Sequence, residues 1–266
     1  MHVGAAAATR AGSAVTFRVD YCQPPNPNPT HLGCYRSELA LQRDVQDTLI
    51  DWQAGVGSSE RWFGFSNRLV SFSFDGSAPG TPSGPAPPTP LNGPSFQLHG
   101  GGGRPALKGG HPNINLQVDS TGCADSNRSC PRWTLGVSSK IGGSSNYSNR
   151  CSEGYESCWV LGPALQAGKF DGWNDWVLQW RGSPNQNGYL KMWRNGKVVL
   201  PMVTNIKTTY DDVVPPYLKF GVYRGGWKGA GRPVNATSTS ISYGALRVGD
   251  EKSSFAEVST AQAVKS

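Results

Sequence analysis

The segment YLKFGVYRG at 217–225 carries side chains that could transfer protons or hold an anion. In a β-strand alternate residues share a face, so Tyr217, Lys219 and Tyr223 would lie together, opposite an apolar face. Gly221 would leave room between the amine and the second phenol. A polar strand face is ordinarily solvated surface, but two phenols and an amine around a glycine also suit a proton-transfer site.

Two further segments present polar pairs by the same alternation. In FQLH, Gln97 and His99 share a face, and four glycines follow the histidine, where they would let the chain pass close to a ligand. In CYRSELA, Arg36 and Glu38 share a face. The alternatives without a function are that His99 is a surface-loop residue and that Arg36 and Glu38 form a surface ion pair. If the three segments are neighbouring strands of one sheet, their polar faces would form a single site.

Arginine, glutamine, histidine, lysine and tyrosine in one site point to β-elimination from a uronic acid. The proton on C5 of a uronate is very weakly acidic, so hydrogen bonds or positive charge on the adjacent carboxylate stabilise the enolate-like intermediate. A base then removes the C5 proton, and an acid protonates the departing glycosidic oxygen. Tyrosine, with an ordinary pKa of about 10, suits these steps when cations lie close to it. The reaction needs neither an organic cofactor nor a nucleophile.

The elements that must position these residues are predicted to be β-strands. The 266 residues include 34 Gly, 20 Pro and 9 Trp, which favours strands and turns. The dipeptide Asn195-Gly196 predicts a tight hairpin. The segment SELALQRDVQDTLI at 37–50 is an ambiguous helical candidate. Alternating or aromatic and β-branched segments predict strands over 15–21, 61–70, 96–99, 114–118, 133–137, 176–181, 189–194, 197–203, 217–224 and 237–248.

These segments show no βαβ rhythm, so the predicted fold is all-β. We expect an antiparallel β-sandwich jelly roll, concanavalin-like, with a concave substrate groove. The predicted organisation is a flexible N-terminus (1–12), one jelly-roll domain (13–250) and a polar C-terminal tail (251–266). Tryptophans at alternating strand positions are expected in the core rather than stacked on sugars. They are Trp173, Trp176, Trp180 and Trp193.

Charge and cysteine content indicate the surroundings of the protein. The net charge of +7 suits an anionic partner, while the scattered basic residues argue against nucleic acid. The chain has no run of 18 apolar residues that would predict a membrane span. Six cysteines in three local pairs suggest disulfides, and so a secreted or periplasmic protein. The simplest of several pairings joins Cys22 to Cys34, Cys123 to Cys130 and Cys151 to Cys158.

The segments YRSEL, FQLHG and YLKFGVYRG, in this chain order, resemble the three signature segments of jelly-roll polysaccharide lyases. These include alginate lyases, heparin-lyase-I-like enzymes and glucuronan lyases. RWFGFS (61–66) and GWNDWVLQWRG…GYLKMWRNGKVV (172–199) are most similar to the heparin-lyase-I-like and glucuronan lyase branch. The resemblance covers roughly 35–225.

The resemblance implies a role for each matching residue. Tyr223 would be the acid, and in one version the base as well. His99 would be the base or a neutraliser of the carboxylate, which Gln97 and Arg36 would hold. Lys219 would bind substrate or tune the phenol.

Further substrate-binding candidates are Glu38, expected to orient Arg36, together with Tyr217 and Arg224. Alginate lyases of this fold carry a second arginine two residues after the glutamate, where this chain has Ala40. They also carry an amide pair after the last tyrosine, where this chain has Arg224 and a glycine. These departures favour a glucuronan-like β-1,4-glucuronate chain, with alginate and heparin or heparan sulfate as alternatives.

The prediction is therefore a secreted, monomeric lyase that needs no cofactor, with a structural calcium ion left open. The main rival is a non-catalytic carbohydrate-binding jelly roll, which would not need the set of His, Tyr, Lys and Arg. A glycoside hydrolase would need two carboxylates flanking the bond, and no such arrangement is evident. No nucleic acid or membrane partner is expected.

Overall fold

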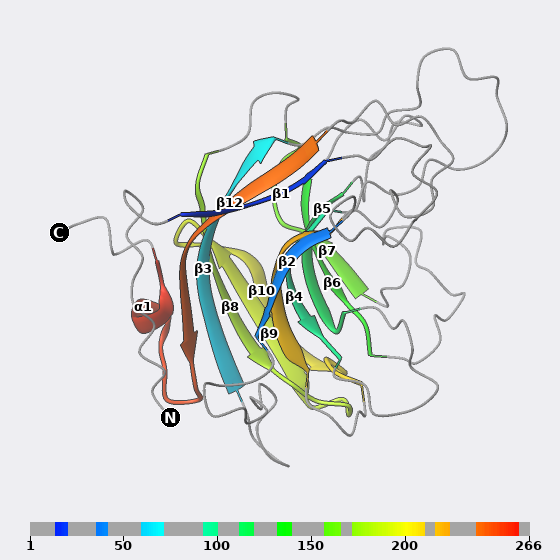
Figure 1. The fold of residues 1–266 in the computed structure, drawn as a ribbon. Helices are drawn as coiled ribbons and strands as arrows, with labels where there is room; N and C mark the ends of the chain where they lie inside the picture. Colours follow the sequence, from blue (N-terminus) through cyan, green and yellow to red (C-terminus); the bar gives the residue numbers. More distant parts are fainter. Residues whose placement is uncertain are drawn as a thin grey trace, which may run out of the picture.

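The computed structural model describes residues 14–20, 36–41, 60–71, 93–100, 112–119, 132–139, 157–165, 172–210, 216–223 and 238–260. Within these stretches the chain forms antiparallel β-strands and one short helix (Figure 1). The strands make two sheets that pack face to face, which is the predicted β-sandwich jelly roll.

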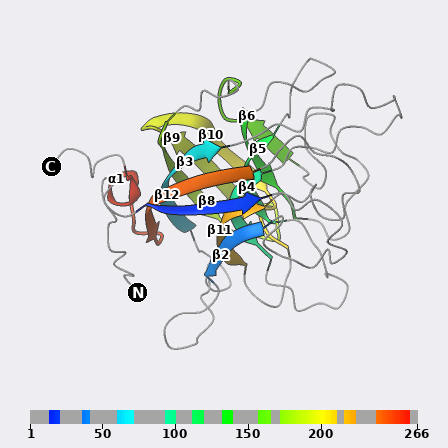
Figure 2. The same cartoon turned by 45° about the horizontal axis from the view of Figure 1, so that its top comes forward.

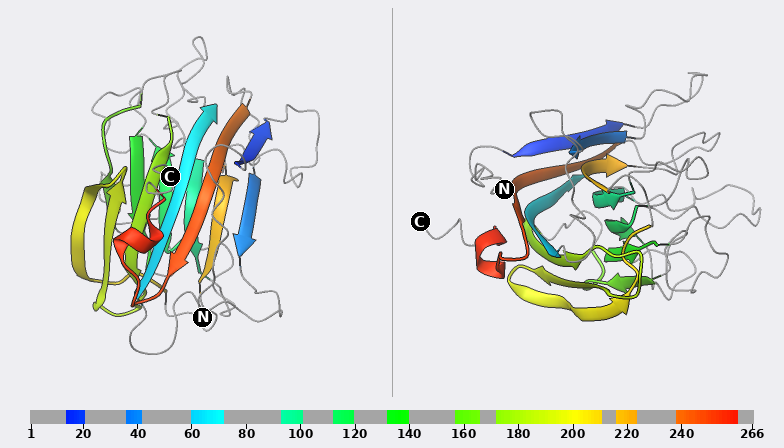
Figure 3. Two further views of the ribbon diagram at one scale, coloured as in Figure 1. Left: turned by 90° about the vertical axis from the view of Figure 1, so that its left-hand side faces the viewer. Right: turned by 90° about the horizontal axis from the view of Figure 1, so that it is seen from below.

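The first sheet, which we call the β3 sheet, has six strands and curls round the core (Figure 3, right). Its order is β1 (Val15–Asp20), β12 (Ser238–Gly249), β3 (Glu60–Ser71), β8 (Asn174–Arg181), β9 (Gly188–Arg194) and β10 (Lys197–Ile206).

The second sheet, which we call the β11 sheet, also has six strands. Its order is β2 (Arg36–Leu41), β11 (Tyr217–Tyr223), β4 (Gly93–His99), β5 (Ile114–Asp119), β6 (Arg132–Val137) and β7 (Ser157–Val160). The edge strands β1 and β2 of the two sheets lie close to one another (Figure 2).

Aromatic side chains fill the space between the sheets. Phe65 of β3 stacks on Phe96 of β4 with ring centroids 4.5 Å apart, and Trp133 of β6 packs edge-on against Trp176 of β8 at 5.3 Å. Trp176 and Trp180 are fully buried in this core, as predicted. Burying such large apolar surfaces is the main favourable term in folding, so the core fixes which face of each strand points outward.

The predicted strands are confirmed, with shifts of a few residues at their ends. The hairpin between β9 and β10 turns at Asn195 and Gly196, whose φ angles of 52° and 77° suit a type I′ turn. The helical prediction is wrong over 37–41, where the chain forms β2, and the rest of that segment lies outside the described residues. Strand β7 was not predicted.

A short helix, α1 (Phe255–Val258), follows β12 and packs on the outer side of the β3 sheet (Figure 1). Val258 is buried there with Trp62, and the partly buried Trp193 packs against them. A Cβ atom on Gly64 of β3 would lie 1.8 Å from the Val258 carbonyl oxygen, so the helix can approach the sheet only over a glycine. Among the described residues, no helix is long and apolar enough to cross a membrane.

Candidate active site

The three strands that carry the predicted site residues are consecutive in the β11 sheet. β11 lies in the middle, with β2 on one side and β4 on the other. The side chains of Leu218 and Val222 on β11 and of Leu98 on β4 point into the core, so the polar residues between them lie on the opposite face. The predicted meeting of the three polar faces is therefore observed.

The register places the site positions in directly opposed pairs across these strands. In order along β11 they are Tyr217–His99, Lys219–Gln97, Gly221–Glu38 and Tyr223–Arg36. Opposed residues in an antiparallel pair have Cβ atoms roughly 5 Å apart, so Tyr217 can act together with His99, and Lys219 with Gln97.

The ammonium group of Lys219 forms a buried ion pair with Glu38. The Lys219 Nζ lies 3.0 Å from the Glu38 Oε2, and the two side chains are only 9% and 5% exposed. The sequence also suggested that Glu38 would orient Arg36. That contact stays a prediction, because the side chain of Arg36 lies outside what the structure describes.

Gly221 allows β2 to approach β11 closely. Its φ angle is 139°, and a Cβ atom there would lie 2.3 Å from the carbonyl oxygen of Ser37 and 2.7 Å from the Cα of Glu38. Only glycine meets both conditions without strain. The sequence interpretation gave Gly221 the task of leaving room between Lys219 and Tyr223. In the structure, the absence of a Cβ atom at Gly221 also lets β2, the strand that carries Glu38, pack close to β11.

His99 lies against the ring of Tyr217, with the ring centroids 5.2 Å apart. Its Nδ1 atom is 3.1 Å from the carbonyl oxygen of Gly100. A carbonyl oxygen only accepts hydrogen bonds, so Nδ1 carries a proton. In the neutral imidazole the lone pair is then on Nε2, which is the form that a general base needs.

The side chain of Gln97 lies on the polar face, directly opposite Lys219. The residue is only 3% exposed, and its amide is not among the fully enclosed groups that lack a hydrogen-bond partner within the described ranges. An amide N–H in this position can donate to a carboxylate oxygen of a ligand.

Tyr223 lies at the far end of β11 from His99. It is half-buried on the polar face and opposed to Arg36. It lies six positions along the strand from Tyr217, which corresponds to about 20 Å in an extended chain. The structure thus brings His99 together with Tyr217 rather than with Tyr223. Arg224 lies outside the described residues.

Three polar residues on β5 and β6 extend the same face and were missed in the sequence. Asn115, directly opposite Gln97, donates from Nδ2 to the Oε1 of Gln117 at 2.6 Å. Thr134, opposite Gln117, is 1% exposed, and its hydroxyl has no hydrogen-bond partner within the described ranges. The alternation of polar and apolar residues in INLQVD was the available signal.

Cysteines and metal ligands add little to the described site. Cys158 on β7 is disulfide-bonded, and the other five cysteines lie outside the described ranges, so the predicted pairing stays a prediction. In the part of the chain that the structure describes, no cluster of His, Cys, Asp and Glu could hold a metal ion. A structural calcium ion therefore stays a prediction from the sequence.

An apolar cavity of about 150 Å³ lies between the edge strands of the two sheets. Its lining includes Val15, Phe17, Leu39, Phe220 and Tyr243. These side chains belong to the core side of the sheets, opposite the polar face. A ligand in this cavity could therefore not contact the polar residues described above.

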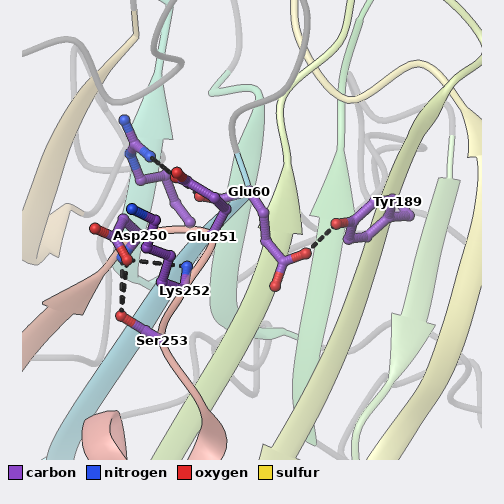
Figure 4. A network of polar contacts seen from close by, with 7 residues as sticks. Glu60, Tyr189, Asp250, Glu251, Lys252 and Ser253 are labelled. Atoms are coloured by element: carbon purple, nitrogen blue, oxygen red, sulfur yellow. Dashed lines mark hydrogen bonds and ion pairs between the residues drawn. The ribbon is translucent and has the colours of Figure 1, made fainter.

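A second polar cluster lies on the β3 sheet (Figure 4), whereas the candidate site lies on the β11 sheet. Glu60 accepts hydrogen bonds from the hydroxyl of Tyr189 and, at 2.8 Å, from the Nε2 of Gln179. Burial and the nearby Glu60 carboxylate raise the pKa of Tyr189 to about 12. Arg61 of the same strand lies 3.7 Å from Glu251, which is largely exposed. The cluster contains no residue of the predicted site.

Three comparisons with known proteins bear on this arrangement. Among solved structures, the endo-β-1,4-glucuronan lyase of the fungus Trichoderma reesei is 18% identical, with 97% of this chain and 95% of that chain covered and a TM-score of 0.53. The marine PL7 alginate lyase AlyA1 of Zobellia galactanivorans is 15% identical, with 91% and 79% covered and a TM-score of 0.53. The alginate lyase AlyC3 is 12% identical, with 89% and 75% covered and a TM-score of 0.51.

These likenesses show the fold, and a sequence search of curated proteins finds no match. The family model described as polysaccharide lyase matches residues 6–243, which is most of the chain. The chain therefore belongs to the polysaccharide lyase family.

Proposed function

We propose that this polysaccharide lyase cleaves a uronate-containing anionic polysaccharide by β-elimination and leaves 4,5-unsaturated uronide ends. The observation that carries the proposal is the polar face shared by β2, β11 and β4, on which Gln97 lies directly opposite Lys219 and on the same strand face as His99. An amide N–H on a residue that is only 3% exposed can donate to a carboxylate oxygen, and such a hydrogen bond is stronger where most water is excluded.

In this mechanism Gln97 and Arg36 hold the carboxylate of the sugar whose C5 proton is removed. Their hydrogen bonds strengthen as negative charge moves onto the carboxylate in the enolate-like intermediate, so they lower the barrier rather than only bind substrate. Electrons then pass from the C5–H bond into a C4–C5 double bond, and the bond from C4 to the glycosidic oxygen breaks. The departing oxygen takes a proton from an acid.

Two phenols on β11 are candidates for that acid. The resemblance to polysaccharide lyases favours Tyr223, whereas the register places Tyr217 beside His99. The base and the acid of one elimination act on neighbouring atoms of the same sugar. If His99 is the base, the acid is Tyr217. Tyr223 is the acid only if it also serves as the base, with Arg36 opposite it.

A β-1,4-glucuronan is the proposed substrate. Its support is the likeness of this chain to the Trichoderma reesei glucuronan lyase and the presence of Ala40 where alginate lyases carry an arginine. The net charge of +7 suits any polyanion and does not choose among them. We further propose a monomeric, secreted enzyme, in keeping with the six cysteines.

The test of this function is the ultraviolet absorbance of the C4–C5 double bond. The protein is incubated with glucuronan, alginate, heparin, heparan sulfate, hyaluronan or pectate, each with and without a chelator. We expect absorbance to rise on glucuronan without added metal. A rise on another polymer would correct the substrate, and no rise on any polymer, with binding retained, would favour the carbohydrate-binding alternative.

A further inference from the structure

The buried ion pair of Glu38 and Lys219 affects which anions the site can accept. Its atoms lie 3.0 Å apart, and both side chains are at least nine-tenths buried on the polar face. Lys219 is opposed to Gln97, the amide assigned to the substrate carboxylate. The only cation beside that amide for which the structure describes the side chain is therefore already paired with a carboxylate.

Pairing removes most of the attraction that Lys219 would exert on an anion. At about 4 Å and the effective dielectric constant of a protein surface, one unit charge contributes roughly 4 kcal/mol, which an adjacent opposite charge largely cancels. The Glu38 carboxylate also repels any further negative group brought close to it. One carboxylate can be held by the neutral amide of Gln97, whereas a second anionic group on the same sugar would meet no uncompensated charge from this pair.

We propose that Glu38 is a specificity-determining residue, which positions Lys219 and excludes sulfated uronates by cancelling its charge. The inference rests on the proposed function and narrows its substrate class to polyuronates without sulfate next to the bound carboxylate. Gly221 contributes to the same pairing. Strand β2 can bring Glu38 close to Lys219 only where β11 lacks a Cβ atom.

The experiment measures heparin and glucuronan binding by calorimetry, with heparin as the sulfated probe. Glu38→Gln keeps the shape of the side chain and removes the negative charge that opposes the Lys219 ammonium, so heparin should bind at least about tenfold more tightly than to the wild type. Glu38→Asp keeps the charge and should bind heparin as weakly as the wild type. Unchanged heparin affinity in a folded Glu38→Gln protein would overturn the proposal.

Glu251→Gln is the matched control, because it removes the same charge from the Arg61–Glu251 pair on the other sheet. The heparin affinity of the Glu251→Gln protein should stay within about twofold of the wild type. An equal gain in both variants would mean that heparin affinity depends only on the net charge of the protein, and would overturn the proposal. If Glu38→Gln does not fold, Lys219→Met tests the same point, since it removes the ammonium charge opposed to the Glu38 carboxylate and should weaken heparin binding by a similar factor. A folded Lys219→Met protein with wild-type heparin affinity would overturn the proposal.

Wild-type cleavage separates this inference from the proposed function. If the wild type cleaves no polyuronate, the proposed function fails whatever heparin does. If it cleaves glucuronan while the Glu38 variants bind heparin equally, only the specificity inference fails.

Discussion

His99 and Tyr217 occupy directly opposed positions on β4 and β11, and their ring centroids lie 5.2 Å apart. Tyr223, the other phenol of the polar face, lies six residues further along β11 and opposite Arg36. The two phenols therefore belong to different ends of the site, and they should respond differently to substitution.

We expect the variants of the opposed pair to behave alike. If His99 is the base, His99→Asn and Tyr217→Phe should each lower kcat by about 100-fold or more, while Tyr223→Phe has a smaller effect. If Tyr223 performs both proton transfers, Tyr223→Phe should be the severe variant, and the opposed pair should show milder losses of similar size. Initial rates on one polymer decide between these patterns. Severe losses in His99→Asn and Tyr223→Phe with a fully active Tyr217→Phe would contradict the register argument.

Gln97→Met should separate activity from stability. Burying an amide costs free energy, and Gln97 is only 3% exposed, so replacing it with an apolar side chain of similar size should leave the free energy of unfolding unchanged or slightly higher. The same change should lower kcat/KM by about 100-fold, because a donor to the developing charge is lost. Urea unfolding and initial rates measure the two quantities.

Gln179→Met is the control for that variant. Gln179 donates to Glu60 on the other sheet, so its loss should cost about 1 kcal/mol of stability and leave activity within about twofold. If Gln97→Met destabilised the protein as much as Gln179→Met and lost no activity, Gln97 would be a structural residue.

Gly221→Ala should be far more harmful than an ordinary glycine substitution. The residue combines a φ angle of 139° with a Cβ position 2.3 Å from the Ser37 carbonyl oxygen, so β2 would have to move away from β11. We expect a loss of more than about 2 kcal/mol in stability together with a loss of activity. Gly196→Ala, at a φ angle of 77° with no neighbour within 4 Å, should cost about 1 kcal/mol and spare activity. Equal effects in the two variants would show that the close approach of β2 is unimportant.

Tyr189 should make stability fall at high pH. Burial and Glu60 raise its pKa from 10.0 to about 12, so between these values the unfolded chain loses the phenolic proton before the folded protein does (Figure 4). By linkage, the free energy of unfolding falls as pH rises through this window, and the contribution of the raised pKa is fully present below pH 10. Urea unfolding at several pH values should show that the stability difference between wild type and Tyr189→Phe changes only above about pH 10. A constant difference would contradict the raised pKa of Tyr189.

The strands could be predicted because each buries one face, and burial leaves a two-residue alternation in the sequence. β2 was assigned in part to a helix because Leu41, Val45 and Leu49 recur every four residues in the sequence, a spacing that suits a helix. As an edge strand β2 pairs only with β11, and that contact lies far along the chain. β7 covers only four residues, which is too few for a clear pattern.

The face of each site residue could be predicted, but the register could not. Alternation places Tyr217, Lys219 and Tyr223 on one side of β11, and a slip of two residues against β4 would keep every one of them there. Which phenol meets His99, and that Glu38 meets Lys219, therefore depends on how the whole sheet assembles. Asn115 and Gln117 were overlooked because amides next to apolar residues occur in many strands.

The most direct test of the account is the mass of the products released from glucuronan by the wild-type protein. β-Elimination predicts oligouronides that are lighter by one water than hydrolysis would give and that show the ultraviolet absorbance of a C4–C5 double bond. The Gln97→Met protein should form these products about 100-fold more slowly. Products with the full mass of hydrolysed chains, or unsaturated products formed equally well by Gln97→Met, would contradict the account.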